Sequence, residues 1–161
     1  MDTIAITLFQ TLIDVGLYQA ALPTSQLLWI FTAAVSVPLL PVSSELWAMK
    51  KKHLLGSGLN TLVKLSFVFL LPLIIIMVAF SETILTLFFG SEYVGAAPIL
   101  QVLSISALFY TLYSLFSVSL VGIGKPRQTM YAVVTMSIFN FIMNIILVPL
   151  IGSIGAALVT T

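Results

Sequence analysis

The chain has 161 residues, of which 60% are hydrophobic and only 7% are charged. A soluble domain carries about 25% charged residues, so this chain lacks the polar side chains that a surface in water needs, and we assign it to a lipid bilayer. Its net charge of +1 does not indicate nucleic-acid binding, and the lack of cysteine excludes disulfides and thiolate metal sites.

The charged residues divide the sequence into long uncharged segments. A helix needs about 20 apolar residues to cross the hydrocarbon core, and a lone apolar strand would leave backbone groups unpaired in lipid. We therefore predict an all-α, polytopic transmembrane helix bundle that forms a single transmembrane domain over residues 1–161, with partial helices at both ends. The four full spans are predicted at residues 18–42, 59–80, 97–121 and 128–149.

The basic residues predict the orientation of these spans. The predicted connections are residues 14–17, 45–58, 81–96, 122–127 and 150–155. Three lysines at 50–52 fall in the second connection, Lys125 and Arg127 fall in the fourth, and Lys64 lies one to two turns into the helix after the second. All six basic residues lie toward one face, which the positive-inside rule makes cytoplasmic. We expect a multi-pass protein of the cell membrane with residues 45–58 and 122–127 in the cytoplasm.

Two of these connections carry further features. Residues 50–53 read KKKH, a cluster more typical of a topological anchor than of the alternative, a phosphate or lipid site. The third connection contains an apolar stretch, Ile84 to Phe89, that is too short to cross the membrane. We predict an interfacial helix there, closed by Gly90 as its C-cap.

Two segments of the chain are similar to each other. "YQAALPTSQLL" begins at Tyr18 and "YVGAAPILQVL" begins at Tyr93. Proline is tolerated in the first turn of a helix, and tyrosine suits the membrane interface, so both segments have the composition of a helix start. An internal repeat of helix pairs, as in many transporters, is the alternative, and the sequence leaves both open.

The polar residues indicate no enzyme. The sequence holds no paired carboxylates within a span, no Ser/His/Asp set and no glycine-rich phosphate loop, and we expect no catalytic residue, metal or cofactor. Lys64 either extends to the interface or faces a cavity as a cation. Asn140 and Asn144 share a helix face and either bind a neighbouring helix or line a polar path. The serines of the third span, Ser104, Ser106, Ser114, Ser117 and Ser119, are expected to allow close helix packing.

Four stretches, in this order, form a pattern over almost the whole chain. They are Asp2 followed by "GLYQAA", then "PLLPVSSELWA", then "ILTLFFGSEYVGAAPILQVLSISALF", and finally "GKPR" followed by "NFIMNIILVPLIGSIGAALVTT". In this order and spacing the chain resembles the polysaccharide and lipid-linked oligosaccharide flippases of the multidrug/oligosaccharidyl-lipid/polysaccharide (MATE-like) exporter superfamily.

The resemblance implies about twelve to fourteen helices in two lobes around a central cavity, working by alternating access. It implies that this chain is a piece, corresponding to most of the C-terminal lobe and inactive alone. The implied partners are the bilayer, a lipid-linked oligosaccharide, and either a missing N-terminal lobe or a second copy of the chain. Asp2, Lys64, Asn140 and Asn144 are the candidate residues lining the cavity.

Two other functions stay open. The first is a cation-coupled drug or metabolite antiporter, which needs a buried acidic residue, and Asp2 is the candidate for it. The second is a small helical membrane protein that serves as a partner subunit without transport.

Overall fold

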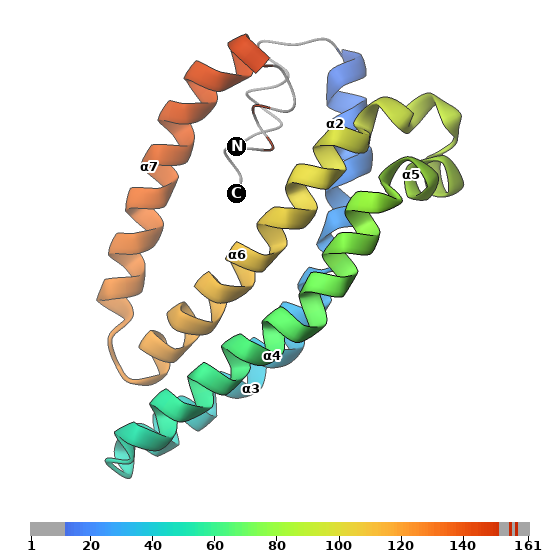
Figure 1. The fold of residues 1–161 in the computed structure, drawn as a ribbon. Coiled ribbons are helices and arrows are strands. Elements are labelled where there is room, and N and C mark those ends of the chain that lie inside the picture. Colours follow the sequence, from blue (N-terminus) through green and yellow to red (C-terminus); the bar gives the residue numbers. More distant parts are fainter. Residues whose placement is uncertain (1–11, 152–154, 156, 158–161) are drawn as a thin grey trace.

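The computed structural model describes residues 12–151 together with Gly155 and Ala157. These described residues form helices and no strand, which confirms the predicted all-α bundle (Figure 1). In chain order the elements are α2 (Leu12–Gln26), α3 (Trp29–Ala48), α4 (Lys52–Ala79), α5 (Ser81–Phe89), the 3₁₀ helix η1 (Ser91–Ala96), α6 (Ala97–Gly122) and α7 (Pro126–Ile151).

Four of these helical segments are long and apolar enough to cross a membrane, as the sequence predicted. They are Trp29–Ala48, Lys52–Ala79, Ser91–Gly122 and Pro126–Val148. Figure 1 shows that α3 and α4 form one long hairpin and that α6 and α7 form another. The tight turns of both hairpins lie at the same end of the bundle, while α5 and η1 lie at the other end.

The start of the first span differs from the prediction. Residues 14–17, predicted as a connection, lie inside α2, and the predicted span 18–42 is instead α2 followed by α3. Pro23 lies within α2 and not in a first turn. Proline lacks an N–H and so removes the helical bond to the carbonyl of Gln19, four residues earlier, whereas the helix is interrupted further along, at residues 27–28. There the amides of Leu27 and Leu28 bond back to Thr24 and Ser25 at 3.4 and 3.1 Å.

The connection predicted at 45–58 is also much shorter than expected. It is a turn at residues 49–51, because α3 extends to Ala48 and α4 begins at Lys52. The amide of Lys50 donates to the carbonyl of Trp47 at 3.0 Å, and that of Lys51 donates to Leu46 at 2.9 Å. This pair of bonds is a Schellman motif, in which the residue at the Lys50 position adopts a positive φ, here 60°.

The turn between α6 and α7 repeats this geometry. The amide of Gly124 donates to Val121 at 3.0 Å and that of Lys125 donates to Leu120 at 2.9 Å. Gly124 has a φ of 78°, which glycine adopts without steric cost. The predicted connection 122–127 is therefore the short turn 123–125, because Gly122 still ends α6 and Pro126 already begins α7.

The third connection folds as predicted, with a short helix closed by glycine. Helix α5 spans Ser81–Phe89, and Gly90 follows it with φ 97° and ψ 168°, a backbone region essentially restricted to glycine. The 3₁₀ helix η1 then leads into α6, where Pro98 occupies the first turn, as the sequence indicated.

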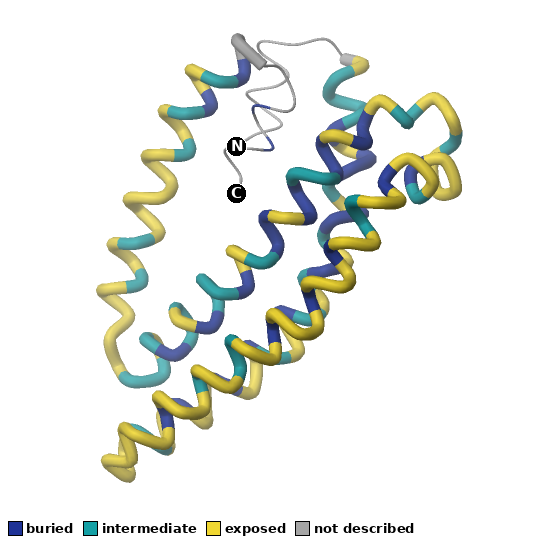
Figure 2. Tube along the Cα trace, viewed as in Figure 1, coloured by how far each residue is buried: buried dark blue, intermediate teal, exposed yellow. Residues whose placement is uncertain are grey.

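Helix α6 is the centre of the bundle. In an 18-residue apolar window of the span that η1 and α6 form together, 44% of the residues are buried, whereas in the matching window of the α7 span only 11% are buried. Figure 2 shows this contrast as dark blue along α6 and yellow along most of α7. Two clusters of buried side chains pack around α6. One, toward the end that holds α5, includes Tyr18, Leu100 and Val148, and the other includes Leu70, Ile74 and Ala107.

Candidate functional site

Helices α3 and α6 are joined by a line of hydroxyl side chains, which we call the hydroxyl seam. It pairs Thr32 with Thr111, Ser36 with Ser114 at 2.9 Å, and Ser43 with Ser119 at 3.3 Å. The residue numbers increase together along both helices, so α3 and α6 run parallel. Such hydrogen bonds between membrane helices are each worth about 0.6 kcal/mol on average.

The seam ends at a very close approach of the two backbones. A Cβ atom added at Gly122 would lie 2.8 Å from the Cβ of Ser43 and 2.9 Å from the carbonyl oxygen of Leu40. The hydroxyl of Ser44 donates to the carbonyl of Gly122 at 2.8 Å. The packing role predicted for the serines of the third span is thus confirmed for Ser114 and Ser119.

The other serines of α6 with a hydrogen bond serve their own helix. The hydroxyl of Ser104 donates to the carbonyl of Leu100, and that of Ser106 donates to Leu103, both at 2.7 Å. The α3 partners of the seam were missed in the sequence. Their signal is the recurrence of Thr32, Ser36 and Ser43 at helical spacing in an otherwise apolar span.

A second polar contact fixes the corner between α4 and α5. The amide nitrogen of Gln101 on α6 donates to the hydroxyl of Ser81 at 3.0 Å and lies 3.4 Å from the carbonyl of Val78. The hydroxyl of Ser81 also donates to Val78, at 3.3 Å. This contact ties the short helix α5 to the central helix.

The two asparagines of α7 lie on one helix face, as predicted. The amide nitrogen of Asn144 donates to the side-chain oxygen of Asn140 at 3.0 Å. Asn144 is 3% exposed and Asn140 is half-buried, although most side chains around them on α7 are exposed. The pair therefore faces inward, one turn before Val148, which belongs to the cluster around Tyr18.

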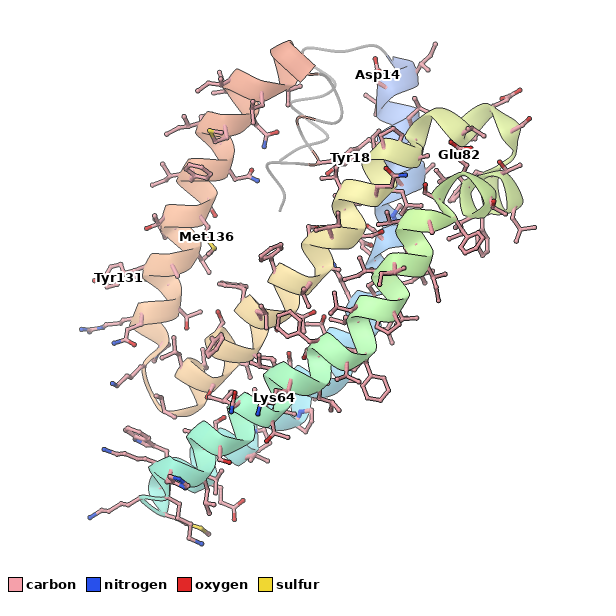
Figure 3. All side chains as sticks on the ribbon, viewed as in Figure 1. Asp14, Tyr18, Lys64, Glu82, Tyr131 and Met136 are labelled. Atoms are coloured by element: carbon pink, nitrogen blue, oxygen red, sulfur yellow. The ribbon has the colours of Figure 1, made fainter. Side chains whose placement is uncertain are left out.

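Lys64 lies apart from the asparagines, on the exposed face of α4 (Figure 3). Because α4 begins at Lys52, Lys64 is about 18 Å along the helix and not one to two turns in, at about 1.5 Å per residue. About 20 residues counted back from Ala79 place the edge of the hydrocarbon core near residue 60. Lys64 then lies about 6 Å inside that edge, within reach of a side chain that extends to the interface.

The acidic candidate Asp2 and the acidic residue that follows it in the chain, Asp14, differ in what the structure shows. Asp2 lies outside the described residues. Asp14, which the sequence placed in a connection, lies instead in the first turn of α2, half-buried and one turn before the buried Tyr18. Figure 3 shows Asp14 and Tyr18 at the end of the bundle that holds Glu82, far from Lys64.

The polar candidates therefore do not gather into one site. Within residues 12–151 the structure shows a hydroxyl seam, an asparagine pair and an exposed lysine on different faces of the bundle. No group of three His, Cys, Asp or Glu residues in the described part of the chain is arranged to hold a metal ion.

The family of the chain follows from its comparison with known proteins. The MatE family matches residues 2–146. The chain belongs to the MatE family. This assignment agrees with the exporter superfamily that the four sequence stretches indicated, and it makes the protein a member of a family of membrane transporters.

Similar proteins come from two archaea. The chain is 37% identical to the uncharacterized membrane protein MJ1068 of Methanocaldococcus jannaschii, over 99% of this chain and 32% of that protein. It is 26% identical to the probable low-salt glycan biosynthesis flippase Agl15 of Haloferax volcanii, over 99% of this chain and 34% of that protein. A second M. jannaschii protein, MJ1375, is 32% identical over 90% of this chain and 33% of its own length.

The chain thus spans about a third of the length of these curated relatives. No solved structure is significantly similar to it.

Proposed function

We propose that this chain supplies one body of helices to a flippase that carries a lipid-linked glycan precursor across the membrane by alternating access. The observation that carries the proposal is the similarity to Agl15 over 99% of the chain, since that relative is named as a probable glycan biosynthesis flippase. Membership of the MatE family supports the transport part of the proposal.

The fold supports a role as a body that moves as a unit. Alternating access is largely the rocking of one helix bundle against another around a fixed site. The hydroxyl seam and the contact at Gly122 hold α3 and α6 together along their length. The α4 side chains Leu70 and Ile74 pack on Ala107 of α6, which adds a third helix to the same unit.

Of the long helices in this body, α7 packs least on the others. Most of its side chains are exposed, and within the described part it packs mainly on α6. The inward-facing Asn140 and Asn144 lie on this helix, at the end that joins the cluster around Tyr18. We propose that α7 borders the transport path and that the asparagine pair contributes polar groups to it.

One observation favours a second candidate function, cation-coupled antiport. The half-buried Asp14 lies in the first turn of α2 in a chain of a transporter family, and acids buried in membrane transporters are candidate sites for a coupling ion. Replacement by asparagine removes the charge at constant size. In a reconstituted full-length transporter that contains this chain, Asp14→Asn should abolish ion-driven drug uptake if the protein is an antiporter.

The flippase proposal is tested in a Haloferax volcanii strain that lacks Agl15. A chimaera in which residues 1–161 replace the aligned third of Agl15 is expressed there, and the low-salt glycan is measured. We expect the chimaera to restore the glycan and the 161-residue chain alone to restore none. A chimaera that is present in the membrane at the level of Agl15 but restores no glycan would contradict the proposal, as would restoration by the chain alone.

A further inference from the structure

An apolar groove of about 700 Å³ lies between the halves of α3 and α4 that lead into their common turn. Two rows of side chains at i, i+4 spacing line it: Pro38, Val42 and Leu46 on α3, and Leu54, Gly58 and Leu62 on α4. The lining hydroxyl of Thr61 donates to the carbonyl of Ser57 in its own helix at 3.0 Å. The groove therefore offers almost no hydrogen-bonding groups to a ligand.

The groove is open because a glycine stands where a side chain would fill it. A Cβ atom added at Gly58 would meet nothing within 4 Å, so neither close packing nor backbone conformation requires glycine there. The same holds for Gly56, which does not line the groove. Two residues apart on a helix point in nearly opposite directions, about 200° apart, so the two glycines form a matched pair.

The length of the groove matches one leaflet of a membrane. Its lining on α3 runs from Ala34 to Leu46, which is about 18 Å at about 1.5 Å per residue. Half of a hydrocarbon core of about 30 Å is about 15 Å. An extended acyl chain in the groove would thus run from the bilayer midplane to the membrane surface.

The end of the groove near the turn carries positive charge. Each of the three exposed lysines, Lys50, Lys51 and Lys52, lies within four residues of Leu46 or Leu54, which line the groove. The ammonium group of Lys52 stands 4.8 Å from the centre of the Trp47 ring, which holds it at the end of α3. Glu45, also exposed, is the acidic residue nearest in sequence, and it leaves the lysines in excess.

We propose that this groove and the lysines beside it form a binding site for one anionic phospholipid. One acyl chain lies between the two rows of apolar side chains, and the phosphate is held by the lysines of the turn. The lipid fills the space that Gly58 leaves and stabilises the two halves of the hairpin against each other. The lysines then bind the phosphate of the lipid headgroup, in addition to setting the orientation of the chain in the membrane.

The test is native mass spectrometry of the purified 161-residue chain, incubated with equal amounts of phosphatidylglycerol and phosphatidylcholine. We expect one phosphatidylglycerol to remain bound, with a preference of about fivefold for each lysine that reaches the phosphate. Gly58→Trp should reduce the bound lipid to the background level, whereas Gly56→Trp should bind like the parent chain. Changing Lys50, Lys51 and Lys52 to glutamine should leave one lipid bound but remove the preference for phosphatidylglycerol.

Circular dichroism reports whether each variant keeps its helices, and Val42→Trp provides a second way to fill the groove from the α3 side. Equal lipid retention by the Gly58 and Gly56 variants would overturn the proposal. It would also be overturned if the parent chain retained both lipids equally. A dimer that dissociates in Gly58→Trp would show that a second copy of the chain, and not a lipid, occupies the groove.

Discussion

Replacing Gly122 by alanine should destabilise the bundle by separating α3 from α6. The added Cβ would lie 2.8 Å from the Cβ of Ser43 and 2.9 Å from the carbonyl oxygen of Leu40. Neither of these atoms is the end of a flexible side chain, so the two helices must shift. The shift also lengthens the bond from Ser44 to the carbonyl of Gly122, now 2.8 Å, and the bond between Ser43 and Ser119, already 3.3 Å.

The expected loss of stability is the cost of overpacking and of weakened hydrogen bonds, less a gain in helix propensity. Overpacking typically costs about 1–3 kcal/mol, and the weakened hydrogen bonds add about 0.6 kcal/mol each. Alanine in place of glycine returns up to about 1 kcal/mol of helix propensity. Gly56→Ala is the matched control, because its Cβ meets nothing within 4 Å and it receives the propensity gain alone.

Because the propensity gain is common to both variants, we expect Gly122→Ala to be about 1–4 kcal/mol less stable than Gly56→Ala. The measurement is unfolding of the purified chain in mixed micelles by titration with a denaturing detergent, followed by tryptophan fluorescence. If the two alanine variants unfold at the same detergent fraction, α3 and α6 do not depend on close contact at Gly122, and the argument from the hydroxyl seam fails.

Three further outcomes are expected. Lys50→Gly should stabilise the chain by about 1 kcal/mol in the same titration, because φ 60° is costly for a residue with a side chain; a loss of stability would show that the lysine has a compensating contact. Asn144→Leu should cost about 0.2–0.5 kcal/mol, because it removes the i,i+4 bond to the neighbouring asparagine, while Ile145→Leu, on an exposed face, should be silent; equal effects would make the pair irrelevant to packing. Single cysteines at Met49 and Ser91, both exposed and at opposite ends of the bundle, should differ in intact cells, with only Ser91→Cys labelled by an impermeant maleimide; equal labelling would contradict the predicted orientation.

The sequence predicted the number and type of the membrane helices well but placed several of their ends wrongly. The reason is that charges mark the edge of the hydrocarbon core and not the end of a helix. Residues 45–48 and 52–58 lie outside the apolar runs, yet they remain helical, since nothing in them stops the backbone ladder. The helix ends are set by local caps. Gly90 was recognised because glycine is the usual signal, whereas Lys50 carries no such signal at a positive φ.

The candidate site was harder to predict because its residues depend on the pairing of distant helices. The i, i+4 spacing of Asn140 and Asn144 was enough to predict that they share a face. The partners of Ser114 and Ser119 lie more than 70 residues earlier in the chain, and spacing alone does not indicate which helix they contact. Asp14 was misplaced because α2 continues through residues that read as a connection.

The two hairpins give the clearest physical argument for an internal repeat. α3 and α6 run parallel, both end in a Schellman motif, and the positive φ falls on Lys50 in one and on Gly124 in the other. The returning helices then differ: α4 packs along α6 over much of its length, whereas α7 packs on α6 far less. If both hairpins descend from one unit, α7 occupies the position in its hairpin that α4 occupies in the other. It lacks the extensive packing that α4 makes on α6. If the chain is part of a longer transporter, we expect its other helices to pack on the surface that α7 exposes, opposite the inward face that holds Asn140 and Asn144.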